Sequence, residues 1–105
     1  MSHYRLLRDT EHRIAEIYHY TVGRWGEDQA LRYYNGLLDM FEAIAERRVP
    51  WRSLPTKFGI HGGHYCRFER HYIYWRMLDD GIVGIVAILH ERMHQQEWLH
   101  EAFND

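Results

Sequence analysis

Cysteine, proline and long apolar runs are all scarce in this sequence. The single cysteine, Cys66, allows no internal disulfide and fits a reducing compartment, where a small buried hydrophobe is a commoner role than a nucleophile. The longest apolar run, Ile82–Leu89, has eight residues, whereas a membrane-spanning helix needs roughly 20. No charged-then-apolar leader, internal repeat or low-complexity tract is visible. We therefore expect a soluble, cytoplasmic protein.

The composition is that of one small domain covering residues 1–105. Of its 105 residues, 46% are apolar and 15% aromatic, which is enough for a small core. Thirteen basic residues against fifteen acidic ones leave a formal charge of −2, without the basic excess of a nucleic-acid binder. The nine histidines could add positive charge below neutral pH. We expect no direct sequence-specific binding of nucleic acid.

The centre of the chain predicts an antiparallel meander over about residues 64–90. Ile82–Leu89 is apolar at nearly every position, as in a central strand buried on both faces. The preceding Asp80-Gly81 pair is typical of a type I′ hairpin turn. His71–Met77 and Tyr65–Arg70 both alternate, so both predict half-buried strands, although the turn between them carries no Gly or Asn.

Alternation also assigns the two faces of the predicted sheet. The inward set is Cys66, Phe68, Ile73, Trp75 and Met77. The outward set is Tyr65, Arg67, Glu69, Tyr72, Tyr74 and Arg76. We expect the inward face to carry the core and the outward face to be solvated or to bind a partner.

Two amphipathic helices are predicted upstream, as an antiparallel hairpin over about residues 10–48. His3–Leu7 precedes them as an edge or joining strand, and Asp9 or Thr10 offers an N-cap for a helix from Thr10 to Val22. A glycine-containing reversal of about four residues then leads into a second helix that starts at Glu27 and ends near Arg48.

The remaining segments are a loop and a short helix. Val49–Gly63 has no periodicity and predicts a loop, whereas Gln95–Phe103 predicts a terminal helix that must dock on the domain or on a partner. The tryptophans divide accordingly: we expect Trp25 to plug the end of the hairpin, Trp75 to lie in the core, and Trp51 and Trp98 to be exposed interface anchors.

One motif points to metal chemistry. His90-Glu91-Arg92-Met93-His94 satisfies the zinc-protease pattern H-E-x-x-H, and His100 stands at the spacing of a third ligand. That chemistry needs both histidines on one face of a helix, but His90 directly follows a predicted strand. We therefore expect no metal and no cofactor, and keep a zinc hydrolase only as a minor alternative.

A second constellation combines arginines with aromatic residues on or just after the strands. Its members are Arg67, Arg70, Arg76, Arg92, Tyr65, Tyr72, Tyr74 and His90. Such a set can hold phosphates and bases, with a histidine to move protons during ribose 2′-hydroxyl attack. The simpler interpretation is cross-strand packing of arginines on aromatic rings.

The order of strand, helical hairpin, loop and meander resembles the ParE/RelE superfamily of bacterial type II toxins. Three segments are similar to its ParE branch: Tyr18-His19-Tyr20-Thr21 followed by Trp25-Gly26-x-x-Gln29-Ala30, then His71-Tyr72-Ile73-Tyr74-Trp75-Arg76, then Ile88-Leu89-His90-Glu91-Arg92-Met93. The resemblance covers about Tyr4 to His94. It implies an α+β fold with an N-terminal strand, a helical hairpin on an antiparallel meander and a short C-terminal helix.

The resemblance also implies a function. A ParE-like toxin inhibits DNA gyrase by direct binding, needs no catalytic residue of its own, and is neutralised by a cognate ParD-like antitoxin. Under this interpretation the target-binding residues are His90, Glu91, Arg92, Met93 and Trp98. The antitoxin-binding residues are Ile14, Tyr18, Tyr34, Leu38, Phe41, Tyr72, Tyr74 and Arg76. The C-terminal segment is residues 91–105, and its part from Gln95 on departs from the family pattern.

The alternative within the same superfamily is a RelE-like endoribonuclease that cleaves mRNA on the ribosome. Its catalytic set would be Arg67, Arg76, His90 and Arg92. That branch implies a dense cluster of basic residues and a terminal tyrosine. Here Lys57 is the single lysine and no tyrosine follows Tyr74, so the ParE-like function is favoured.

Overall fold

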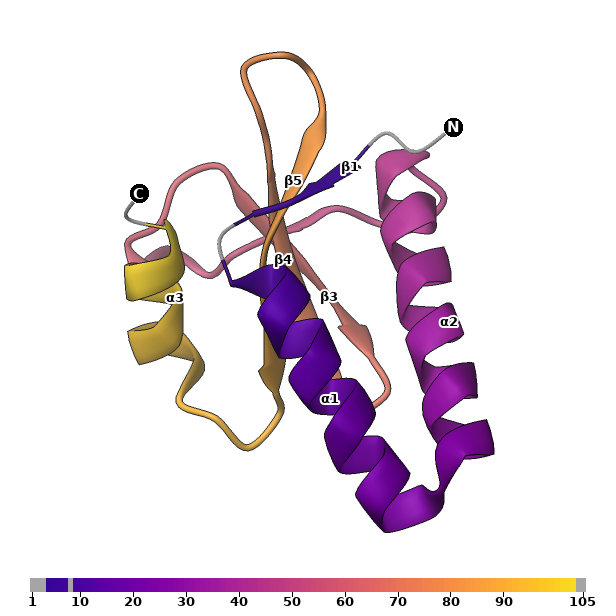
Figure 1. Ribbon diagram of the computed structural model, residues 1–105. Helices are drawn as coiled ribbons and strands as arrows, with labels where there is room; N and C mark the ends of the chain where they lie inside the picture. Colours follow the sequence, from indigo (N-terminus) through magenta and orange to yellow (C-terminus); the bar gives the residue numbers. More distant parts are fainter. Residues whose placement is uncertain (1–3, 8, 104–105) are drawn as a thin grey trace.

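A five-stranded mixed sheet forms the centre of the computed structural model (Figure 1), which describes residues 4–7 and 9–103. The elements in chain order are β1 (Tyr4–Leu6), α1 (Thr10–Trp25), α2 (Glu27–Ala45), β2 (Arg52–Ser53), the 3-10 helix η1 (Thr56–Phe58), β3 (Gly63–Phe68), β4 (His71–Met77), β5 (Val83–His90) and α3 (Gln95–Phe103). The strand order is β1-β5-β4-β3-β2, with β1 parallel to β5 and the other pairs antiparallel. The predicted fold is confirmed.

Helices lie over both faces of this sheet. The prediction that the outward face is solvated or binds a partner is therefore wrong for Tyr74, which the domain itself covers, whereas Arg67 and Glu69 are exposed. The hairpin of α1 and α2 packs on one face around Phe41, Trp75 and Ile85, each with no exposed surface. On the other face, α3 and the segment after α2 enclose a second cluster that contains Tyr74, Leu89 and Leu99. Figure 1 shows α3 on the side of α1 that faces away from α2. Tyr74 is therefore only 3% exposed, because α3 docks over its face of the sheet.

The strand from Val83 to His90 is buried throughout except at His90, as its apolar run predicts. The register shifts between Tyr74 and Trp75 of β4, which pair with Ala87 and Ile85, so the extra residue of this bulge is Val86 in β5. Met77, predicted to point inward with Trp75, is 43% exposed because it lies at the end of β4, beyond the helical layer. Trp75 lies in the core as predicted.

The two hairpin turns differ from the expected types. Between β4 and β5, Leu78 accepts a hydrogen bond from the Gly81 N–H and donates one to Ile82, and only Gly81 has a positive φ (82°). This is a three-residue loop with glycine in the left-handed region, not a type I′ turn. Between β3 and β4 the two-residue loop places Glu69 at φ 53°, a conformation that costs a non-glycine residue about 1 kcal/mol. Strand β3 accordingly ends at Phe68, not at Arg70.

The helical hairpin turns on a single residue. Helix α1 continues through Gly23 to Trp25 rather than ending at Val22, and Gly26, at φ 90°, joins it directly to α2. Trp25 does not plug the hairpin, since the sharp reversal leaves its side chain 67% exposed. The side chain of Asp9, the N-cap residue, makes no capping hydrogen bond to α1. The hydroxyl of the buried Thr10 instead donates to the Leu7 carbonyl (2.6 Å) and lies 3.2 Å from the Ile85 carbonyl.

The segment after α2 is more ordered than a loop. Helix α2 ends in a Schellman motif, with Arg47 at φ 61° and the Arg48 N–H bonded to the Ala43 carbonyl. Trp51 is half-buried, not an exposed anchor, because its indole N–H donates to the Ile44 carbonyl and the Arg47 guanidinium lies 3.5 Å above its ring. The predicted loop also contains β2 and η1. Within residues 4–7 and 9–103, no helix has the length and apolarity to cross a membrane.

Candidate functional site

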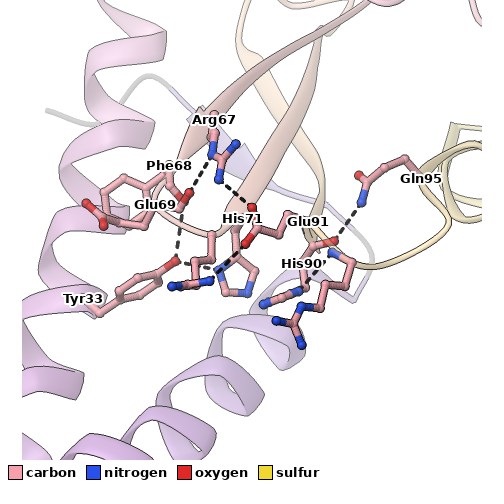
Figure 2. A network of polar contacts seen from close by, with 10 residues as sticks. Tyr33, Arg67, Phe68, Glu69, His71, His90, Glu91 and Gln95 are labelled. Carbon is pink, nitrogen blue, oxygen red and sulfur yellow. Dashed lines mark hydrogen bonds and ion pairs between the residues drawn. The ribbon is translucent and has the colours of Figure 1, made fainter.

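The C-terminal segment, residues 90–98, leaves the sheet at the end of β5 and is fastened there by Glu91. The Glu91 N–H donates to the Arg70 carbonyl (2.9 Å), which extends the pairing of β4 with β5 by one residue. The Glu91 carboxylate accepts hydrogen bonds from Arg67 (2.5 Å) and Arg70 (3.3 Å) (Figure 2). Arg67 also donates to the Glu69 carbonyl, so one carboxylate joins the C-terminal segment to the β3–β4 turn.

Gln95 makes the second attachment, at the start of α3. Its side-chain amide donates to the carbonyls of His90 (2.8 Å) and Met93 (3.1 Å), and its side-chain oxygen accepts from the Tyr74 hydroxyl. Tyr74 is buried, and burial raises the pKa of its hydroxyl, so it stays a proton donor at neutral pH. Side chains therefore hold the turn between β5 and α3 at both ends, Glu91 at the end of β5 and Gln95 at the start of α3.

Helix α3 packs on the sheet through one apolar side chain and exposes another to solvent. Leu99 is fully buried against the second core cluster, whereas Trp98 is 44% exposed. The Arg13 guanidinium of α1 lies 5.8 Å from the centre of the Trp98 ring. Within the C-terminal segment Arg92 is exposed and His90, Glu91 and Met93 are half-buried. The predicted target-binding residues thus lie on one continuous, anchored segment.

The predicted antitoxin-binding residues lie in several environments. Ile14, Phe41 and Tyr74 are buried in the two cores. Tyr72 and Arg76 are half-buried on β4. Tyr18, Tyr34 and Leu38 remain accessible on the hairpin, and the rings of Tyr18 and Tyr34 meet edge to face with centroids 6.1 Å apart.

Leu31 was missed from sequence, although it lies on the face of α2 that carries Tyr34 and Leu38. It is 51% exposed and stands three residues before Tyr34 and seven before Leu38. The spacing of Leu31, Tyr34 and Leu38 could have predicted a second apolar face. The stronger pattern of the buried residues Ala30, Leu37 and Phe41 in the same helix obscures it.

A groove of about 1050 Å³ separates the far end of the hairpin from the β3–β4 turn. Its rim carries Tyr20 and Trp25, which are 63% and 67% exposed. Its charged lining residues are Arg13, Glu16, Arg32, Glu69 and Arg70. Sequence analysis missed this groove because its walls come from four separate segments.

Two histidines and a tyrosine form the polar floor of the groove. His71 and His90 are paired residues of β4 and β5, and their rings meet edge to face with centroids 5.2 Å apart. The Tyr33 hydroxyl of α2 lies 2.6 Å from His71 Nδ1 (Figure 2). Burial, together with the neighbouring His90, lowers the pKa of His71 to about 4. Burial raises the pKa of Tyr33 to about 12.

The structure does not assemble the predicted nuclease set. His90 pairs with His71, whereas Arg76 pairs with Gly84, five residues further along β4. At about 3.3 Å per residue, the backbone of Arg76 lies roughly 17 Å along the sheet from the pair His71 and His90. Arg67 is engaged by Glu91, and its guanidinium lies 5.7 Å from the centre of the Tyr72 ring, its partner residue across β3 and β4, as the simpler packing interpretation predicts.

The H-E-x-x-H pattern does not form a metal-binding helix. His90 ends a strand, His94 lies in the turn before α3, and His100 lies in α3 with Gly59 beside it. Among the residues that the structure describes, no group of three or more His, Cys, Asp or Glu could hold a metal ion. Cys66 is half-buried on β3, and burial raises the pKa of its thiol to about 11, which disfavours the nucleophilic thiolate.

Comparison with known proteins agrees with the fold and extends it. Residues 4–95 match the family model for the ParE toxin of the type II toxin-antitoxin system parDE. The chain is 31% identical to Toxin ParE1 of Caulobacter vibrioides over 100 residues, covering 94% of this chain and 99% of that protein. It is 30% identical to Toxin ParE of Escherichia coli over 93 residues, covering 89% of this chain and 88% of that protein.

A solved structure shares the fold at low sequence identity. It is described as the chromosomal ParDE TA system from P. aeruginosa and superposes with a TM-score of 0.69 at 15% identity, covering 86% of this chain and 96% of that one. The family model spans all the elements that build the sheet and the hairpin. The chain therefore belongs to the ParE toxin family of type II toxin-antitoxin systems.

Proposed function

We propose that this chain is a toxin that poisons DNA gyrase by direct protein binding in the bacterial cytoplasm, and that a cognate ParD-like antitoxin neutralises it. Family membership supports the class of activity. The observation that carries the assignment of a target surface is the anchored C-terminal segment, residues 90–98. It holds an exposed arginine and an exposed tryptophan in a fixed arrangement.

A fixed arrangement matters because binding must offset the entropy of ordering flexible side chains and loops. Glu91 and Gln95 already hold the turn that carries Arg92, while Leu99 holds the helix that carries Trp98. Arginine and tryptophan are also the residue types that most often dominate interface energy. We assign Arg92 and Trp98 the main contacts with gyrase, with Met93 beside them.

The proposed action is binding without covalent chemistry by the toxin itself. The separation of Arg76 from His90 and the formal charge of −2 both weigh against a nuclease that works on the ribosome. No residue of the C-terminal segment is given a catalytic role.

The antitoxin is proposed to dock on the hairpin through a helix. Tyr18, Leu31, Tyr34 and Leu38 provide the accessible apolar surface that an amphipathic helix needs. Ile14, Phe41 and Tyr74 are left out of this surface, because their burial removes them from contact with any partner in this conformation.

An extended segment of the antitoxin is proposed to add to the free edge of β3. Strand β2 pairs only with His64 and Tyr65, whereas β3 continues to Phe68. In the described part of the chain, no strand lies beside Cys66, Arg67 and Phe68 on that side. An unpaired edge of this kind accepts a peptide by main-chain hydrogen bonds, so the same strand would also bring the antitoxin next to Arg67 and Glu91.

The experiment is supercoiling by purified gyrase with increasing toxin. Wild-type protein should inhibit supercoiling and accumulate cleaved DNA, and Arg92→Ala or Trp98→Ala should each raise the required concentration by roughly 10-fold or more. Arg48→Ala is the matched control, because it removes an exposed arginine that belongs neither to the segment nor to the lining of the groove beside it. Full activity of Arg92→Ala and Trp98→Ala would remove the assigned surface.

Antitoxin binding is tested separately, by titration with the purified cognate antitoxin. Tyr34→Asp should weaken binding by at least about 10-fold, because it places a charge in an apolar contact. The same variant should inhibit gyrase as wild type does. Unchanged antitoxin affinity would remove the hairpin as the docking surface.

A further inference from the structure

The floor of the groove contains two imidazole N–H groups that the fold orients without giving them an acceptor. His71 and His90 lie side by side on adjacent strands. The Tyr33 hydroxyl lies 2.6 Å from His71 Nδ1 but 3.5 Å from the Phe68 carbonyl, so its single proton is best placed on His71. Because His71 Nδ1 then accepts, the proton of this neutral ring is on Nε2.

His90 is held in the same tautomer by a different donor. The backbone N–H of Arg92 donates to His90 Nδ1 at 3.1 Å, so Nδ1 is an acceptor and Nε2 carries the proton. Within residues 4–7 and 9–103, neither Nε2 atom makes a hydrogen bond to the protein. Two imidazole donors of fixed tautomer therefore belong to the lining of one groove, with their rings 5.2 Å apart.

The charged groups around these rings make the site suitable for an anion. Arg13 and Arg70 line the same groove as both histidines, and Arg13 acts electrostatically on His71. The carboxylates of Glu16 and Glu91 are already engaged, by Arg13 (3.6 Å) and by Arg67 and Arg70 respectively. Glu69 is the remaining acidic group of the lining, and its exposed side chain stands on the turn.

We infer that His71, His90 and Arg13 form an oxyanion site that takes the carboxylate of an acidic side chain from a protein partner. A carboxylate is favoured over a nucleic-acid phosphate because the chain has a formal charge of −2 and the rest of the groove is not a basic track. The exposed rings of Tyr20 and Trp25 at the rim would contact the apolar part of the peptide. Naming the antitoxin as this partner rests on the proposed function.

The site is first tested without any partner, by titrating sodium acetate at constant ionic strength and following the imidazole 15N and 1H resonances. The Nε2–H signals of His71 and His90 should shift together and saturate, with half-saturation on the order of 10 mM. His94 should not respond. Tyr33→Phe should abolish saturation at His71 while keeping the ring, since it removes the donor that fixes the tautomer. Arg13→Ala, which removes the half-buried guanidinium from the groove, should weaken acetate binding at both histidines.

Inorganic phosphate and a short single-stranded oligonucleotide form the comparison arms. Tighter binding of the oligonucleotide than of acetate would overturn the carboxylate assignment, and linear shifts without saturation in the acetate arm would overturn the site. The cognate antitoxin forms the last arm, where His90→Gln should weaken binding about 10-fold and His94→Gln should not. Equal binding to both variants would overturn the assignment of the antitoxin. An antitoxin that fails to bind wild-type toxin contradicts the proposed function, whereas the acetate arm judges the site independently.

Discussion

Removing the Leu99 side chain should release α3 while the rest of the domain stays folded. Leu99 is the fully buried residue of α3 and contacts the cluster that contains Tyr74 and Leu89. A buried Leu→Ala change typically costs roughly 3 kcal/mol. A nine-residue helix is not stable alone, and each ordered residue costs about 1–2 kcal/mol of backbone entropy, so α3 is held by a small net margin.

The consequence is local because the two cores lie on opposite faces of the sheet. The hairpin core around Phe41 and Trp75 does not include Leu99. In Leu99→Ala the free energy of opening α3 should therefore fall by most of the ~3 kcal/mol, whereas the free energy of global unfolding should fall by less.

Native-state hydrogen exchange measures both quantities. Amides of α3 should exchange about 100-fold faster in Leu99→Ala, and amides of α2 and β5 should change little. Leu31→Ala is the matched control, since the same atoms are removed from a leucine that is 51% exposed. If the amides of α2 and β5 accelerate as much as those of α3, the protein is one cooperative unit and this reasoning is wrong.

Three further predictions concern single residues. Because the folded pKa of His71, about 4, lies below its ordinary value, the unfolded chain binds more protons in acid. The neutral His71 ring therefore contributes fully to the free energy of unfolding above about pH 6.5, and this contribution is lost as the pH falls toward 4. From pH 7 to 5, urea unfolding of wild type should lose roughly 1 kcal/mol more than that of His71→Leu, allowing for the partial exposure of the ring. If wild type and His71→Leu lose the same free energy of unfolding, the lowered pKa of His71 is contradicted. Cys66, with its pKa raised to about 11, should react with iodoacetamide at pH 7.5 only after denaturation, and rapid native alkylation would refute its burial. Gly23→Ala should stabilise by roughly 1 kcal/mol, since a Cβ there meets nothing within 4 Å, whereas Gly36→Ala should destabilise because its Cβ would lie 2.9 Å from the Phe68 ring. Thermal unfolding compares the two variants, and equal shifts would contradict the packing of Phe68.

Alternation and helical periodicity predict most of the fold because each strand and each long helix must bury one side. The hairpin follows this rule, and β5 follows the rule for a strand covered twice. Strand β4 alternates in sequence, yet its consecutive residues Ile73, Tyr74 and Trp75 are all buried. Periodicity does not reveal what covers a face, and nothing in the sequence of β4 indicates that α3 docks over Tyr74.

Local backbone conformation was harder to predict than element type. Glu69 and Arg47 both adopt positive φ angles that the sequence would normally give to glycine or asparagine. Local hydrogen bonds accompany these conformations, from the Arg67 guanidinium to the Glu69 carbonyl and from the Arg48 N–H to the Ala43 carbonyl. A rule based on residue type alone does not include such contacts.

The assignment of residues 90–93 and Trp98 to target binding stays a prediction; residues 90–93 follow the family pattern, whereas Trp98 lies where the sequence departs from it. The contacts that anchor this segment, Glu91 with Arg67 and Gln95 with Tyr74, join residues more than 20 positions apart. The groove and its pair of histidines depend on the register of β4 and β5 and on the position of α2. Those relations are set by packing, so they became visible only in three dimensions.

The most direct test of the central claim is the amount of cleaved plasmid that purified gyrase accumulates. Three samples are compared: the wild-type toxin, the toxin premixed with antitoxin, and the toxin that carries both Arg92→Ala and Trp98→Ala. Wild-type protein should accumulate linear DNA at micromolar concentration, equimolar antitoxin should abolish it, and Arg92→Ala combined with Trp98→Ala should leave little. Undiminished cleavage by the double variant, or no cleavage with wild-type protein, would contradict a toxin that acts on gyrase through residues 90–98.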